Sequence, residues 1–123
     1  MRTANRKDKN TKEIQDSIVK NGWQYIDTHD VGNGFPDCIA IKKTGKIFIS
    51  TFIEIKSPSG ELTESQIAFH DKHKGLVYVC KTKFDVTKVL RGYERSLRKE
   101  MKRERIMQNS ARVEKARLPN NTD

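Results

Sequence analysis

Apolar and polar positions repeat along this chain first at helical and then at strand spacing. Ile14, Ile18 and Val19 recur at intervals that place them on one side of a helix. Gly22 follows as a stop signal, so the pattern predicts a short amphipathic helix over residues 11–20.

Strand signals come next. Residues 23–26 indicate a first strand or extended arm, and the glycine-rich stretch 29–34 is typical of a loop. A short strand is predicted over 37–41, a turn over 42–45 and a long strand over 46–56. The last two strands are expected to pair as a hairpin.

A second helix is predicted over residues 64–74, because Thr63 and Gln66 have the spacing of a capping box and Gly75 ends the pattern. The apolar run 76–80 then predicts a short strand that is buried on both faces. A strand, helix, strand succession favours a right-handed crossover, which makes this strand parallel to the long one.

Asp85 is expected to cap a last helix that begins at Val86, runs to about Arg105 and frays beyond it. The predicted fold class is therefore α/β, a mixed sheet flanked by helices. The predicted organisation is a disordered basic arm over 1–10, a core over 11–90, and a basic helical extension over 91–123 that ends in a disordered tail.

Two opposite charges stand inside the apolar run of the long strand. Glu54 and Lys56 lie two residues apart, so in a strand they point to the same face. A structural ion pair at the edge of the core explains them on the strand alone. A second acidic residue, Asp37, follows Pro36 upstream and offers a functional explanation.

Pro36 and Asp37, followed on the next strand by Glu54, Ile55 and Lys56, resemble the signature of the PD-(D/E)xK nuclease superfamily. The similarity is closest to its small stand-alone VRR-Nuc branch and covers residues 13–80. The further positions that carry it are Gly34, Phe35, Gly60, Glu61, Leu62, Thr63 and Gln66.

The resemblance implies a restriction-endonuclease-like αβββαβ core and a metal-dependent DNA endonuclease. The cofactor implied is Mg²⁺, for which Mn²⁺ can substitute, because a hard cation accepts carboxylate and carbonyl oxygens. The catalytic residues implied are Asp37, Glu54, Lys56 and Gln66. The metal ligands implied are Asp37, Glu54, the backbone carbonyl of Ile55, and Glu13.

Several of these roles have ordinary alternatives. Glu13 is either the third carboxylate of the site or a solvated acid on the first helix, and Asp16 is its rival. Gln66 either lies in the active site or only caps its helix. His70, one turn beyond Gln66, either faces the same cleft or is an ordinary surface histidine, and Ser57 either touches phosphate or belongs to a turn.

Positive charge is concentrated in the flanks of the chain. The net charge is +9, yet residues 13–90 hold ten basic and ten acidic residues, and residues 91–118 hold ten basic and four acidic ones. Such flanks suit a polyanion such as DNA, although a solubilising tail has the same composition. The residues expected to bind DNA are Lys42, Lys43, Lys46, Ser57, Arg95, Arg98 and Lys102.

No stretch is apolar and long enough for a transmembrane helix, and the N-terminus has no signal-peptide pattern. We therefore expect an intracellular, cytoplasmic protein, in the host cytoplasm if it is phage-encoded. Cys38 and Cys80 are expected as buried, reduced thiols. Phe35, Phe48 and Phe52 are expected in the core.

Three functions remain open on the sequence. The first is an endonuclease that acts on branched DNA, resembling Holliday-junction resolvases, as a homodimer whose two-fold axis sets two sites against opposed strands. The second is a sequence-specific or nicking endonuclease of the restriction type. The third is a non-catalytic DNA-binding accessory module, which is expected to lack one of the key carboxylates or the lysine.

Overall fold

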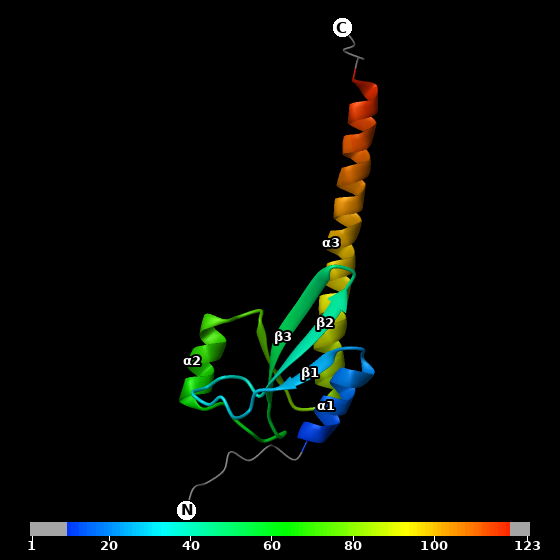
Figure 1. Cartoon of the computed structure of the whole chain (residues 1–123). Coiled ribbons are helices and arrows are strands. Elements are labelled where there is room, and N and C mark those ends of the chain that lie inside the picture. Colours follow the sequence, from blue (N-terminus) through cyan, green and yellow to red (C-terminus); the bar gives the residue numbers. More distant parts are fainter. Residues whose placement is uncertain (1–9, 119–123) are drawn as a thin grey trace, which may run out of the picture. The chain divides into compact units, whose positions relative to one another are not determined.

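The computed structural model describes residues 10–118, so residues 1–9 of the arm expected over 1–10, and residues 119–123 of the expected tail, lie outside the described residues. The chain divides into two compact units, one ending at Leu90 and one beginning at Arg91. Its elements are α1 (Thr11–Lys20), β1 (Gln24–Asp27), β2 (Cys38–Thr44), β3 (Ile47–Ile55), α2 (Glu64–Lys72), β4 (Val77–Cys80) and α3 (Lys83–Arg117) (Figure 1).

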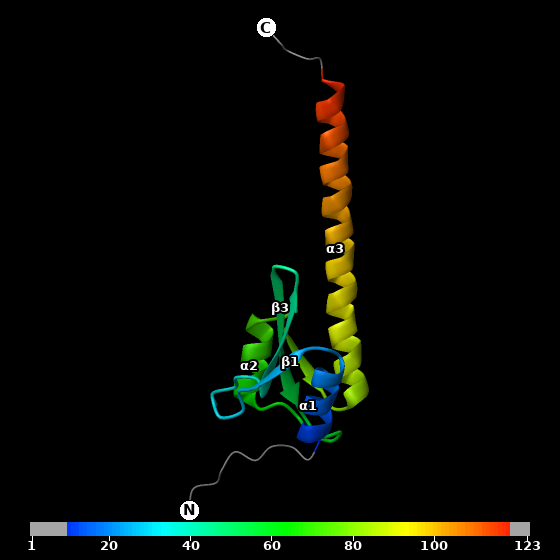
Figure 2. The ribbon, with the colours of Figure 1, turned by 45° about the vertical axis from the view of Figure 1, so that its right-hand side comes forward.

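The four strands form one mixed sheet in the order β1-β2-β3-β4. β1 with β2 and β2 with β3 pair antiparallel, whereas β3 and β4 pair parallel, as the predicted crossover requires. α2 covers one face of this sheet and α1 the other (Figure 2). The expected α/β nuclease-like fold is confirmed.

The two faces of the sheet are packed differently. The largest apolar side chains that are fully buried come from α1, β3 and the first turns of α3: Ile14, Ile18, Ile53, Ile55, Val86 and Leu90. On the opposite face Phe35, Phe52 and Phe69 meet edge to face, with ring centroids 5.4 Å, 5.4 Å and 6.2 Å apart. This aromatic cluster joins α2 to the middle of β3.

The hairpin differs from its prediction. β2 continues to Thr44, so the turn consists of Gly45 and Lys46 only, and Gly45 has φ +61°. Lys43 pairs with Phe48 in the ladder. Charged side chains are tolerated in this part of the strand because it is exposed to solvent. Phe48 is 67% exposed and does not belong to the core, contrary to expectation.

The ends of the later helices also differ. α2 ends at Lys72 rather than 74, and β4 begins at Val77. α3 begins at Lys83 rather than Val86, because Thr82 is its cap: Thr82 Oγ1 accepts the Asp85 N–H at 3.2 Å, and Asp85 Oδ2 accepts the Thr82 N–H at 3.2 Å.

α3 also runs to Arg117 instead of ending near Arg105. Residues 93–117 contain no glycine or proline and are rich in strong helix formers, so charge alone does not end the helix.

Trp23 lies just before β1 and is buried. Cys38 and Cys80 are buried free thiols, as expected. Among the described residues, no helix has the length and apolarity needed to cross a membrane.

Candidate active site

The site begins with the carboxylate of Asp37, which precedes the first residue of β2. Asp37 Oδ2 accepts the backbone N–H of Ile55 at 2.7 Å. The register pairs Cys38 with Ile53, so by alternation Asp37 and Glu54 share the opposite face of the sheet. The hydrogen bond therefore holds the Asp37 carboxylate beside the peptide that joins Glu54 to Ile55.

Glu54 lies next to Ile55 on β3, and it is only 1% exposed. A buried carboxylate is costly unless charged or polar groups compensate it, and such residues are concentrated at functional sites. Asp37, just before β2, and Glu54, on β3, thus lie on the same face of the sheet at the C-terminal end of β3.

The loop before Asp37 is fixed on two sides. Thr28 donates its backbone N–H to Asp37 O and its hydroxyl to Pro36 O, both at 2.8 Å. Gly34 has φ +81°, and a Cβ at this position would overlap the backbone carbonyl of Ser65 in the first turn of α2. The glycine of the motif therefore allows the loop to lie directly against α2.

Lys56 follows β3 immediately and is half-buried. Its N–H donates to Cys80 O at 3.2 Å, and its carbonyl accepts from Asn10 Nδ2 at 3.0 Å. The same Asn10 amide donates to Lys81 O at 2.6 Å, so it joins the chain just after β3 to the chain just after β4. Asn10 was missed on the sequence, since one asparagine in a polar segment gives no signal.

Gln66 caps α2. Its Oε1 accepts the Thr63 N–H at 2.9 Å, and its own N–H donates to Thr63 Oγ1 at 3.3 Å. The capping box is therefore confirmed, while the role of Gln66 in catalysis stays a prediction. Its Nε2 is the donor end of the amide and is not the atom that makes the cap.

His70 lies one turn further along α2, and its Nε2 atom points into the protein rather than into solvent. This atom is buried and has no hydrogen-bond partner among the residues that the structure describes. Burial lowers the pKa of His70, the Asp71 carboxylate opposes this, and the positive charge of Lys56 lowers it further. His70 follows Phe69, whose ring centroid lies 6.2 Å from that of Phe52, so this part of α2 lies over the face of the sheet that holds Glu54.

Asp37, Glu54 and the Ile55 carbonyl are all oxygen donors, which is the donor set that a hard divalent cation prefers. Among residues 10–118, no three His, Cys, Asp or Glu side chains gather closely enough to hold a metal ion. Glu13 is exposed on α1 and does not join the two carboxylates, and Asp16 forms an exposed ion pair with Lys12 at 3.8 Å. Because Mg²⁺ needs only one or two protein carboxylates, the residues present fit it.

The residues expected to bind DNA lie in three places. Lys42 and Lys43 on β2 and Lys46 in the turn lie at the end of the hairpin remote from Glu54. Ser57 accepts the Gly60 N–H at 2.9 Å and so belongs to a turn. The remaining three, Arg95, Arg98 and Lys102, are exposed on α3 in the second unit.

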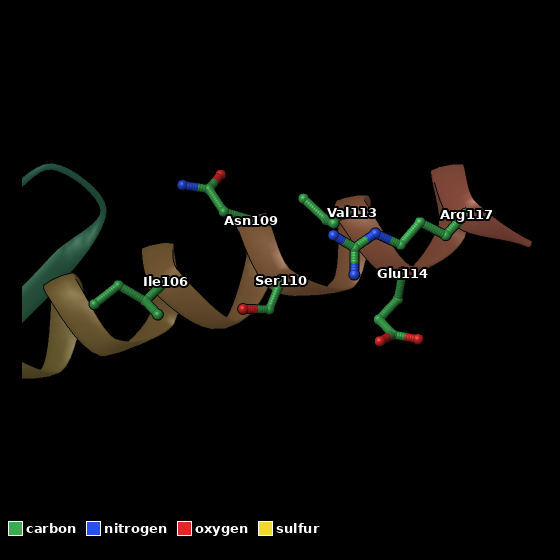
Figure 3. Close-up of a pocket in the computed structure, with 6 residues that line it drawn as sticks. All are labelled: Ile106, Asn109, Ser110, Val113, Glu114 and Arg117. Carbon is green, nitrogen blue, oxygen red and sulfur yellow. The ribbon is translucent and has the colours of Figure 1, made fainter.

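A hollow on α3 is separate from this chemistry. Figure 3 shows its side chains, all from one helix: Ile106, Asn109, Ser110, Val113, Glu114 and Arg117. They supply no paired carboxylates and no second wall from another element, so the hollow does not compete with the carboxylates as an active site.

Comparison with protein families gives one match. The model described as the VRR-NUC domain matches residues 2–84 of this chain. No curated protein and no solved structure matches the chain. The matched range contains Asp37, Glu54, Lys56 and Gln66.

Proposed function

Because this chain belongs to the VRR-NUC domain family, a family of PD-(D/E)xK-like nuclease domains, we propose that it is a Mg²⁺-dependent endonuclease for branched DNA. Family membership makes it a nuclease-type domain whose substrate is DNA. The metal, the endonucleolytic mode and the branched substrate are the parts proposed.

The observation that carries the proposal is the hydrogen bond from Ile55 N–H to Asp37 Oδ2 at 2.7 Å. It fixes one carboxylate next to the strand position of a second, buried one. A purely structural Glu54–Lys56 ion pair gives no reason for Asp37 to be held there.

Asp37 and Glu54, with the Ile55 carbonyl, would hold the metal. When bound there, Mg²⁺ supplies charge stabilisation at the phosphorus and a nucleophilic water near neutral pH. The backbone N–H of Ile55 keeps Asp37 Oδ2 in place, and Asp37 Oδ1 would be available as a metal ligand. Lys56, at the end of the same strand, orients the attacking water and offsets negative charge as it develops on the phosphate.

The distribution of charge supports a DNA substrate that extends beyond the active site. The core is neutral and the flanks are basic, so DNA arms outside the active site find cations in the segments before and after the core. A two-fold homodimer would set two sites against opposed strands, which suits a branched substrate.

The test is cleavage of end-labelled single-stranded, duplex, forked and four-way-junction DNA with Mg²⁺, Mn²⁺ or a chelator. Asp37→Asn, Glu54→Gln and Lys56→Met should each lower the rate by about 100-fold or more. Asp16→Asn is the matched control, because it removes an exposed acid from α1 and should cut like wild type.

Each outcome decides one part of the proposal. Cutting of the junction in preference to the duplex supports a junction nuclease, whereas cutting of one duplex sequence supports the restriction-type alternative. A wild-type chain that binds these DNAs and cuts none with either metal would make the protein an accessory module.

A further inference from the structure

The tip of the β2–β3 hairpin exposes an aromatic ring among lysines. Phe48 is 67% exposed and Ile47 43% exposed, next to the turn of Gly45 and Lys46. Lys43 Nζ lies 5.5 Å from the Phe48 ring centroid. Two adjacent apolar side chains left in water at a strand end forfeit the burial that stabilises the rest of β3.

The charge of this segment indicates what covers it. Between Asp37 and Glu54 the sequence contains Lys42, Lys43 and Lys46 and no acidic residue. A second copy of the chain would bring the same lysines to the same place and is disfavoured by repulsion. A polyanion with aromatic faces satisfies both the cations and the ring.

We propose that the hairpin tip binds an unpaired nucleobase of the DNA substrate, with Phe48 as the stacking surface and the three lysines on the flanking phosphates. This proposal rests on the proposed function only in taking DNA as the partner. It assigns a preference for forked and gapped DNA to one ring, since their unpaired bases are available for stacking, whereas a fully paired duplex keeps its bases stacked on each other.

The separation of Phe48 from Glu54 along β3 also predicts how far from the stacked base the strand is cut. Phe48 and Glu54 are six residues apart on β3 and share one face of the strand. At about 3.3 Å per residue this is roughly 20 Å, or roughly six nucleotides at about 3.4 Å each. A strand that is stacked on the tip and cut at the carboxylates should therefore be cut roughly six nucleotides from its unpaired base.

Binding is measured in chelator, to suppress metal-dependent cleavage, by fluorescence anisotropy with a forked duplex that has single-stranded arms, a gapped duplex and an intact duplex. Phe48→Ala should weaken binding to the gapped and forked DNAs by about 5- to 100-fold, with the duplex unchanged, and Phe48→Trp should restore it. Phe84→Ala is the matched control, because Phe84 is 73% exposed and has Lys83 Nζ 5.5 Å from its ring centroid.

Equal affinity of Phe48→Ala and wild type for all three DNAs overturns the proposal. So does a variant that changes from dimer to monomer in light scattering, because the tip is then an interface between copies. A protein that binds as described but cuts no DNA leaves this inference intact and overturns the proposed nuclease instead.

A second observation concerns His70. Its Nε2 is buried without a hydrogen-bond partner among the described residues, and the neighbouring Phe69 packs on Phe52, two residues before Glu54 on the same face of β3. A buried polar atom left unpaired costs about 1–3 kcal/mol, so a purely structural position would favour an apolar side chain. An imidazole N–H over this face of the sheet is a donor for an anionic oxygen.

We infer that His70 is a further substrate-binding residue of the active site, whose Nε2–H donates to a phosphate oxygen of the DNA next to Lys56. The inference rests on the proposed function. The phosphate would provide the partner that Nε2 otherwise lacks.

Stability and activity should move in opposite directions when the ring is replaced. His70→Phe should raise the thermal midpoint, while it lowers kcat by about 10-fold or more with a smaller change in KM. His70→Gln places an amide donor near the position of Nε2 and should recover much of the rate. His73→Phe, at the C-cap that follows α2, is the control: His73 Nδ1 is hydrogen-bonded to Phe69 O at 2.8 Å, so this change should lower the thermal midpoint instead of raising it.

A His70→Phe variant that is stabilised and fully active overturns the inference, because the nitrogen then serves neither fold nor reaction. Loss of both stability and activity, without recovery in His70→Gln, assigns a structural role and overturns it as well. If wild type cuts no DNA, the proposed function has failed. Isothermal calorimetry with a short phosphorylated oligonucleotide then still tests whether His70 binds phosphate.

Discussion

Gly34 lies where the loop before Asp37 touches α2, and a side chain there has no room. Its φ is +81°, and a Cβ would overlap the Ser65 carbonyl. Gly34→Ala should lower the free energy of unfolding by roughly 3 kcal/mol or more, since strain from positive φ and overpacking add. Urea unfolding followed by circular dichroism measures it.

Gly32 is the matched control for this change. It lies in the same loop with φ +76°, but a Cβ there meets nothing within 4 Å. Gly32→Ala should therefore cost only about 1–2 kcal/mol. Equal costs for the two variants would show that conformation alone, and not the contact with α2, requires glycine at Gly34.

The two thiols give a dependence on pH. Burial raises the pKa of Cys80 from 9.0 to about 12, and burial together with the charge of Asp37 raises that of Cys38. The native state thus favours neutral thiols. Their contribution to stability is complete below pH 9 and is lost as the pH rises toward 12, by up to about 1.4 kcal/mol per pH unit for each thiol.

The same thiols should resist alkylation. With iodoacetamide at pH 8, neither Cys38 nor Cys80 should react in the folded chain, and both should react in urea. Ser59→Cys adds an exposed thiol as the positive control. A native cysteine that reacts as fast as this control would contradict the burial of both side chains.

At the scale of the element, α2 separates two roles of Gln66. The cap uses Oε1 as an acceptor, whereas contact with substrate would use the amide Nε2 as a donor. Gln66→Glu keeps the acceptor, so the thermal midpoint should stay within a few degrees of wild type. If the amide contacts DNA, cleavage should fall by about 10-fold or more.

Gln66→Ala is the companion variant. It removes the acceptor of the Thr63 N–H but keeps the bond from the residue 66 N–H to Thr63 Oγ1, and should lower the stability by about 1 kcal/mol in addition to any loss of cleavage. Full activity in Gln66→Glu would leave capping as the whole role of this residue.

The elements were predictable wherever periodicity and local capping agreed. α1 has the predicted bounds, and the parallel pairing of β4 followed from the helix between the strands. The predicted start of α3 is three residues too late, because the sequence favours Asp85 as the cap itself. Asp85 is instead the third residue of the helix, and its carboxylate accepts the Thr82 N–H. Both residues are capping types, and only the geometry distinguishes them.

The sequence predicts which residues form the candidate site, but it does not predict how their side chains are arranged. The motif named Asp37 and Glu54, but the hydrogen bond to Ile55 N–H that holds Asp37 depends on the register of β2 against β3. The roles of Asn10 and His70 depend on contacts between segments far apart in the sequence. Hydrophobic pattern does not encode such contacts one residue at a time.

At the scale of the whole chain, the second unit holds the largest excess of positive charge. Replacing Arg95, Arg98 and Lys102 with glutamine should weaken DNA binding in low salt. The slope of log K against log salt should fall by about 0.9 for each phosphate that no longer has a cation beside it, which titrations at several salt concentrations measure.

A second triple variant tests whether position matters. Arg112, Lys115 and Arg117 lie further along α3, are exposed, and carry the same charge. Their replacement with glutamine should change the slope less. Identical slopes for the two triple variants would mean that net charge alone, and not binding by the first three residues, determines affinity.

The Asn10 side chain has a consequence for the order of folding. Its amide joins carbonyls 46 and 71 residues away, and β3 pairs with β4 across the whole of α2. Such distant contacts carry a loop-closure cost and form slowly, whereas the β2–β3 hairpin is local. A newly made chain therefore acquires its hairpin first and its cutting geometry last, so both carboxylates exist for a time in a molecule that is not yet a nuclease.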